Sequence, residues 1–168
     1  MASLRGWARI LEAISVGAGI ALAWLGIPVM IATAALEPLL RWSGARADAP
    51  LSEASTVAFL AVTMTSFGYA YAARAHVRLD VISRRFTPRA RAAIELAGVA
   101  LVLLPLCALV VAGGADSAWR SYLQGETWAG SGWPLQWAVR FWVPFGFGLL
   151  LIAALASALR ALLVLVRK

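Results

Sequence analysis

Four long stretches without a charged side chain dominate this sequence. They are 19 to 24 residues long and occupy positions 13–36, 54–73, 96–115 and 141–159. An α-helix rises 1.5 Å per residue, so each stretch is long enough to cross the roughly 30 Å hydrocarbon core of a bilayer. We therefore predict an all-α integral membrane protein with four transmembrane helices at about 13–36, 53–74, 88–114 and 138–165, in a single domain over residues 1–168.

The composition excludes an ordinary soluble domain. Hydrophobic residues make up 62% of the chain and charged residues 14%, whereas soluble domains are about half apolar and a quarter charged. The formal net charge of +7 could suggest a nucleic-acid partner, but such a partner needs a basic, folded surface in water. No soluble segment here is large enough to provide one, so we expect no nucleic-acid binding.

The positive charge instead predicts a topology. Basic residues gather before the first stretch, between the second and third, and at the end of the chain: Arg5 and Arg9, then arginines 74, 78, 84, 85, 89 and 91, then Arg160, Arg167 and Lys168. The two other loops carry acids and bases in balance. By the positive-inside rule we expect both termini in the cytoplasm.

Local signals mark where two helices begin. Ser52 after Pro50 is a candidate N-cap, with Glu53 in the first turn. Thr87 is a second candidate cap, followed by Pro88 at the first helical position, where its missing N–H is not needed. Prolines inside the first, third and fourth predicted helices should produce kinks: Pro28, Pro105 and Pro144.

No residue pattern typical of an enzyme or a metal site is present. The chain has one histidine, His76, and one cysteine, Cys107, which lies within the third apolar stretch. No nucleophile stands beside a base, and no cluster of metal ligands or glycine-rich phosphate loop is found. We therefore expect no enzyme activity, no cofactor and no catalytic, metal-binding or substrate-binding residue in this chain.

Two glutamates lie near the ends of the apolar stretches. Glu12 follows Arg9 by three residues and Glu95 follows Arg91 by four, spacings that favour ion pairs on one helix face at the cytoplasmic interface. The alternative is that Glu12 or Glu95 carries a proton in an independent small four-helix transporter or exporter. Such a carrier should lie deeper in the membrane than these residues do.

A seam of small residues follows the second apolar stretch. Spacings of four and three place them along one helix face, where backbones can approach closely in lipid: Ala54, Ala58, Ala61, Thr65, Gly68 and Ala72. We predict that another helix lies against this seam. That helix belongs either to the chain's own bundle or to a partner protein.

The segment from His76 to Phe86 has the pattern of a short helix lying on the cytoplasmic membrane surface. Apolar side chains occupy one face and charged side chains the other. Anionic headgroups attract basic residues in this position. We expect contacts with lipid headgroups or a partner protein from the polar residues around it: Arg74, His76, Arg78, Asp80, Arg84 and Arg85.

Several of these segments resemble one protein family. The runs are Leu51–Ser55, Phe67–Val81 and Thr87–Arg89, followed by Glu126, Trp133, Pro134 and Pro144 before and within the last helix. Together they resemble the small permease subunit, of DctQ type, of tripartite ATP-independent periplasmic (TRAP) transporters. The stretch around His76, Arg78 and Asp80 is the most specific part of this resemblance.

The resemblance implies a role as one component of a secondary transporter in the bacterial inner membrane. In that family a large permease subunit holds the sodium and substrate sites and moves its transport domain like an elevator. A soluble periplasmic protein captures the solute, usually an organic acid, and delivers it. The small subunit then acts as a scaffold for the large one, which fits a chain whose membrane-spanning stretches carry no charge.

Overall fold

A computed structural model describes residues 2–43, 49–73, 87–128, 134 and 136–166. All secondary-structure elements in this part of the chain are helical, which confirms the predicted all-α class. In chain order they are α1 (Ala2–Trp42), α2 (Ala49–Ala72), α4 (Pro88–Gly98), the π-helical segment η1 (Val99–Leu103), α5 (Leu104–Leu123) and α6 (Gln136–Val166).

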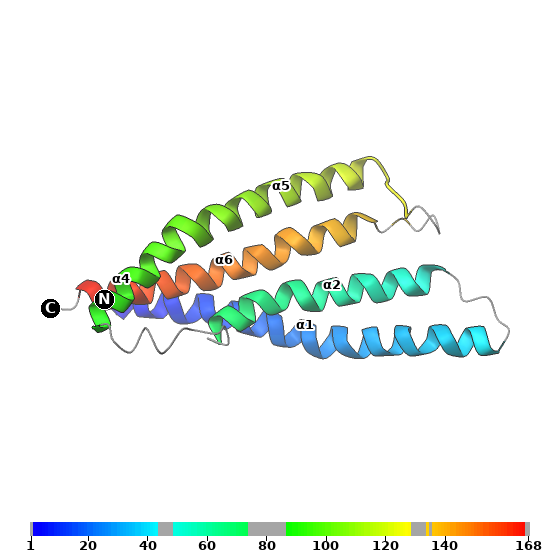
Figure 1. The fold of residues 1–168 in the computed structure, drawn as a ribbon, viewed down its shortest axis with the longest axis horizontal. Coiled ribbons are helices and arrows are strands. Elements are labelled where there is room, and N and C mark those ends of the chain that lie inside the picture. Colours follow the sequence, from blue (N-terminus) through cyan, green and yellow to red (C-terminus); the bar gives the residue numbers. More distant parts are fainter. Residues whose placement is uncertain (1, 44–48, 74–86, 129–133, 135, 167–168) are drawn as a thin grey trace.

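The helices run alternately up and down, and α6 is the central one (Figure 1). It packs against α1, α2, α4 and α5, while α1 and α2 also pack against each other. The start of α1 and the end of α6 lie at the same end of the molecule, which we name the terminal end. The opposite end, where α5 ends and α6 begins, is the distal end.

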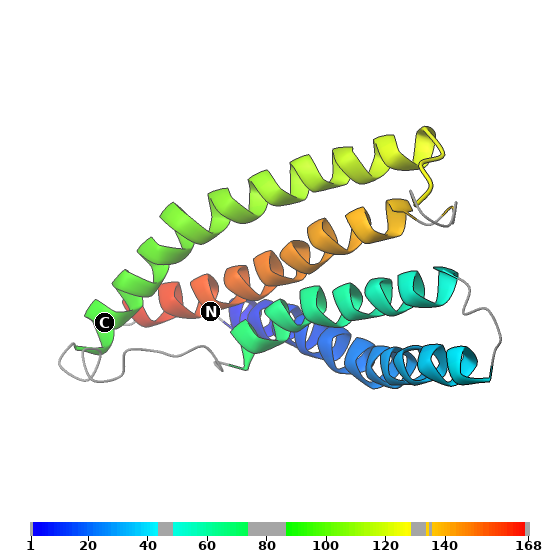
Figure 2. The ribbon, with the colours of Figure 1, turned by 45° about the vertical axis from the view of Figure 1, so that its right-hand side comes forward.

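The last three described elements before α6 form one continuous bent helix, Pro88–Leu123, which we name the bent helix. Figure 2 shows it bowing away from α6 toward the distal end. Among the described helices, α5 makes extensive contact only with α6. The molecule therefore consists of a three-helix unit, α1, α2 and α6, with the bent helix along one side.

Three helices in the described part of the chain are long and apolar enough to cross a membrane: Gly6–Leu40 within α1, Pro88–Leu123 and Gln136–Val166. The remaining long helix, α2, does not reach the same apolarity. Eight of its 24 residues carry hydroxyl groups. Three of the four predicted spans thus have the length and apolarity to cross a membrane, and the fourth, α2, stays a prediction.

Helix α1 is longer than the predicted stretch 13–36 at both ends. At 41 residues it is about 60 Å long, twice the thickness of a hydrocarbon core. Charged residues mark where a helix leaves the hydrocarbon, but they do not end it, since backbone hydrogen bonds continue into the headgroup region. Pro28 and Pro38 lie inside α1 without interrupting it.

The two predicted helix starts have different outcomes. Thr87 is the N-cap of α4, and its hydroxyl accepts a hydrogen bond from the Ala90 amide at 3.2 Å, with Pro88 at the start of the helix. This prediction is confirmed. Ser52 is not a cap, because α2 already begins at Ala49. Proline is tolerated in a first turn, so Pro50 lets the helix start before Ser52.

The kink expected at Pro105 takes the form of a π-helical segment just before it. Within η1 the Leu104 amide donates to the Val99 carbonyl, five residues back. Pro105 has no N–H and cannot continue the α-helical ladder, so a local π-turn lets the neighbouring backbone groups pair in another way. The segment divides the bent helix into α4 and α5.

Candidate functional site

Close approach of α2 and α6 forms the centre of the three-helix unit. A methyl group added at Gly146 of α6 would lie 2.7 Å from the Met64 carbonyl carbon, and one added at Gly68 of α2 would lie 3.0 Å from the Leu149 carbonyl carbon. In both places the neighbour is backbone, which cannot move aside as a side chain can. The two glycines therefore set the spacing between these helices.

Glycines also set the spacing between α1 and α2. A methyl group at Gly19 would lie 2.6 Å from the Tyr69 Cβ atom, and one at Gly26 would collide with the Val62 side chain. Gly19 and Gly26 are two helical turns apart, so they lie on the same face of α1. Close contact thus extends along much of α1 and α2.

The predicted seam on α2 lies at these interfaces. Ala61, Thr65 and Gly68 are buried, and the three other members are half-buried. Gly68 faces α6, and the Thr65 carbonyl lies near Gly19 of α1. The described structure thus places α1 and α6 of the same chain against the seam, one of the two arrangements that the sequence left open.

Two fully buried hydroxyl groups lie inside the three-helix unit. Ser15 of α1 donates to the Leu149 carbonyl of α6 at 2.9 Å, which links the two helices. Thr65 donates to the Ala61 carbonyl of its own helix at 2.7 Å. A hydroxyl in hydrocarbon needs such a partner, so the polar groups at the centre of the unit are neutral and satisfied.

A polar cluster joins the helices at the terminal end. Glu12 of α1 forms an ion pair with Arg160 of α6, and Ser157 of α6 donates a hydrogen bond to Glu95 of α4. Tyr71 of α2 lines a small space of about 20 Å³ beside Glu12, Ser157 and Arg160. The structure thus gives Glu12 and Glu95 each a partner on α6, while their pairs with Arg9 and Arg91 stay predictions.

A second polar cluster joins α5 to α6 at the distal end. Arg140 of α6 pairs with Glu126 at 2.6 Å and donates to Ser117 of α5 at 3.4 Å. Ser121 of α5 donates to the same Glu126 carboxylate at 2.8 Å. Asp116 and Arg120 form a further pair, at 2.6 Å, on the exposed side of α5.

The two clusters are about one hydrocarbon thickness apart. Arg140 and Arg160 are twenty positions apart on α6, which corresponds to about 30 Å along a helix. Between the clusters, the helices that the structure describes contain no Asp, Glu, Lys, Arg or His. The membrane-spanning interior is therefore neutral, and both carboxylates raised as candidate proton carriers lie in the cluster at the terminal end.

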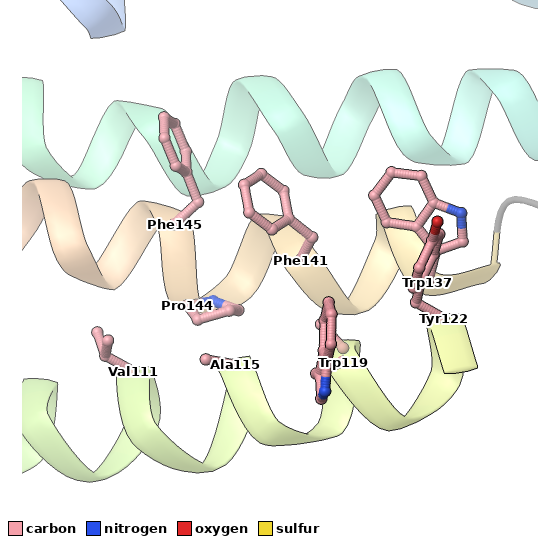
Figure 3. Close-up of a pocket in the computed structure, with 9 residues that line it drawn as sticks. Val111, Ala115, Trp119, Tyr122, Trp137, Phe141, Pro144 and Phe145 are labelled. Atoms are coloured by element: carbon pink, nitrogen blue, oxygen red, sulfur yellow. The ribbon is translucent and has the colours of Figure 1, made fainter. Parts of the chain in front are cut away.

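An apolar groove opens between the bent helix and α6 in the distal half. Its volume is about 520 Å³, and most of its larger lining residues are aromatic. Figure 3 shows Trp119 and Tyr122 coming from α5, and Trp137 and Phe141 from α6. The Tyr122 and Trp137 rings meet edge to face with centroids 5.8 Å apart. The groove has no charged lining residue that could recognise an ionic solute.

The remaining candidates from the sequence are metal ligands, Cys107 and the polar residues around positions 74–85. No set of three potential metal ligands gathers anywhere in the described residues. Cys107 is fully buried in α5. The six polar residues expected to contact headgroups or a partner around positions 74–85 lie outside the described residues, so their role stays a prediction.

Sequence reasoning missed the residues of α6 that hold the bundle together. Arg160 and Ser157 were not predicted as partners of Glu12 and Glu95, and Gly146 was not singled out. The pair Gly19 and Gly26, seven residues apart on α1, was a usable signal of a close helix contact. Helix α6 has two glycines, Gly146 and Gly148, and the sequence does not show which of them faces α2.

A comparison with known proteins identifies the family of this chain. No curated protein sequence and no solved structure matches the chain. A family model described as the DctQ component of tripartite ATP-independent periplasmic transporters matches residues 30–164. This match covers most of the chain, including α2, the bent helix and nearly all of α6, so the protein belongs to the DctQ family of TRAP transporter components.

Proposed function

We propose that this chain is the small membrane subunit that braces the large permease of a TRAP-type secondary transporter. The observation that carries the proposal is the neutral interior between the two polar clusters. A protein that moved a charged solute by itself would need an ionisable or ion-binding group near the bilayer centre. A chain without one can support a moving partner without competing for its cargo.

The proposal includes the remaining parts of the system. The large permease carries out sodium-coupled uptake of an organic acid, and a periplasmic binding protein delivers that acid. The chain lies in the bacterial inner membrane with both termini in the cytoplasm. The polar residues around positions 74–85 contact the permease or lipid headgroups on the cytoplasmic side.

The proposal also makes α2 a fourth membrane span. Its 24 residues reach about 36 Å, enough to cross the hydrocarbon core. Its hydroxyl groups need not be exposed to lipid unsatisfied, because Thr56, Thr65 and Ser66 donate to carbonyls of their own helix at 2.7 to 3.0 Å. Such internal bonds lower the cost of placing Ser and Thr in a membrane.

The bracing role can be tested by co-purification. The chain is expressed with the neighbouring large permease, which carries the affinity tag, and the fraction retained after detergent extraction is measured. An unrelated tagged membrane protein of similar size is the control. We expect retention at near-equal stoichiometry with the permease and none with the control. If the chain is absent from a folded, monodisperse permease, the bracing role is wrong.

The topology can be tested with a matched pair of cysteines in a C107S background. Ser43 follows α1 at the proposed outer side, and Ala73 follows α2 at the proposed cytoplasmic side; both are exposed. We expect a membrane-impermeant maleimide to label S43C in intact cells, and A73C only after the membrane is opened. Equal labelling of both positions in intact cells would contradict the four-span arrangement.

A further inference from the structure

The bent helix is attached firmly at the terminal end. Ala92 of α4 and Val99 at the start of η1 are buried, and α4 packs on α6. Glu95 adds the hydrogen bond from Ser157 of α6. These contacts fix α4 to the three-helix unit.

Immediately after Val99, the bent helix has less packing around its side chains. Leu101 and Val102 are 76% and 65% exposed, and the π-turn interrupts regular α-helical pairing at this point. Gly98 precedes the segment and Pro105 follows it, the first without a side chain to restrict the backbone and the second without an N–H. A change of backbone pairing from α to π, with little packing around it, is what allows a helix to bend.

Toward the distal end, α5 packs on α6, the aromatic groove opens between their side chains, and one polar cluster joins the two helices. Arg140 binds Glu126, just beyond α5, and Ser117 within it, while Ser121 supports Glu126. We name these four residues the distal latch. Both Arg140 and Glu126 are partly exposed, so solvent or another polar group can reach them.

From these observations we propose that η1 is a hinge and that the distal latch, through its Arg140–Glu126 pair, holds the distal end of α5 against α6. When the latch opens, α5 tilts about Val99–Leu103 and widens the aromatic groove, while α4 stays attached to α6. Because α5 is about 30 Å long, each 10° of tilt moves its distal end by roughly 5 Å. The chain can in this way adjust its width without disturbing the glycine contacts of the three-helix unit.

The hinge is tested by measuring distances between nitroxide labels on the full chain in nanodiscs, with Cys107 replaced by Ser. One label pair spans the distal end, L123C on α5 with S52C on α2. The other spans the terminal end, I94C on α4 with A73C after α2. All four positions are exposed.

The latch is opened with Arg140→Gln, and Glu126→Gln serves as the second variant in case the first does not fold. We expect the distal distance to lengthen by roughly 5 Å or more, or to broaden by that amount, while the terminal distance keeps its width and mean. If both distances change together, the bent helix moves as one rigid body and the hinge is wrong. If neither changes in a folded variant, the latch is wrong.

A third measurement locates the hinge. Gly98→Ala combined with Pro105→Ala should stiffen the segment in the Arg140→Gln background, because alanine favours the helix and restores the missing N–H. The distribution of distances between the two distal labels should narrow again. Pro28→Ala in α1 is the control and should leave that distribution broad. A distribution that stays equally broad in the stiffened variant would place the bend elsewhere and overturn the proposal.

Discussion

The three-helix unit and the bent helix differ in the kind of contact that holds their helices together. In the unit, glycines of α1, α2 and α6 bring backbones into direct contact, and a buried serine hydroxyl bonds across to a carbonyl. The bent helix has few such contacts. Most of the surface of α5 is uncovered, and Leu109 on its outer side is 74% exposed.

This difference shows what holds helices together where water is absent. Lipid is as apolar as leucine, so large apolar side chains gain little by turning inward. Association depends on close backbone approach and on satisfied polar groups, and both are concentrated in the three-helix unit. Among the described helices the bent helix packs extensively on α6 alone, and the polar contacts with α6 described above lie at its two ends. We therefore expect the unit to be sensitive to added volume and the bent helix to be tolerant of it.

The largest effect should come from Gly146→Ala in the centre of the unit. The new methyl group would meet the backbone of Met64, which cannot rotate away, so we expect a loss of about 2 kcal/mol in the free energy of unfolding. Thermal or denaturant unfolding in detergent, followed by circular dichroism, measures it. Gly148→Ala, two positions away with open space around it, is the control and should be neutral or slightly stabilising. Equal destabilisation by the two substitutions would contradict the tight α2–α6 contact.

A smaller effect is expected from Ser15→Ala. The substitution removes the hydrogen bond to the Leu149 carbonyl, and interhelical bonds of this kind contribute about 1 kcal/mol in membranes. The same unfolding measurement is compared with Ser66→Ala, an exposed hydroxyl that bonds only within α2. If Ser66→Ala costs as much, the bond between α1 and α6 does not contribute to the stability of the unit.

The smallest effect should be that of Gly114→Ala in α5. Its methyl group would lie 3.0 Å from the Pro144 ring of α6, which is fixed to the backbone, so the contact is relieved by a shift of α5 toward its uncovered side. We expect a change below about 0.5 kcal/mol, close to that of Gly113→Ala, which has nothing nearby. A loss as large as that of Gly146→Ala would remove the distinction between the two regions.

The sequence predicts the elements of this fold better than their arrangement. Charge-free stretches locate the apolar helices, and Thr87–Pro88 locates the start of α4, because both features act locally. The contacts of Glu12 and Glu95 with α6 depend on how each helix is rotated about its axis. A single sequence does not determine that rotation when every face of a helix is apolar.

Two further differences have local causes that sequence patterns only partly reveal. Pro105 indicates a disturbance in the third helix, but not that a π-turn over Val99–Leu103 absorbs it. Ser52 has the residue type of a cap, yet Pro50 is compatible with a helix that begins at Ala49. In both cases several backbone solutions are compatible with the same residues, and the surrounding packing selects one.

The most direct test of the neutral interior is solute uptake by proteoliposomes under an inward sodium gradient. Labelled organic acid and the periplasmic binding protein are supplied outside, and vesicles contain this chain alone, the large permease with the chain, or no protein. We predict uptake by the chain alone equal to that of empty vesicles, and uptake well above it when the permease is also present. Uptake by the chain alone that disappears with Glu12→Gln or Glu95→Gln would contradict the proposed role.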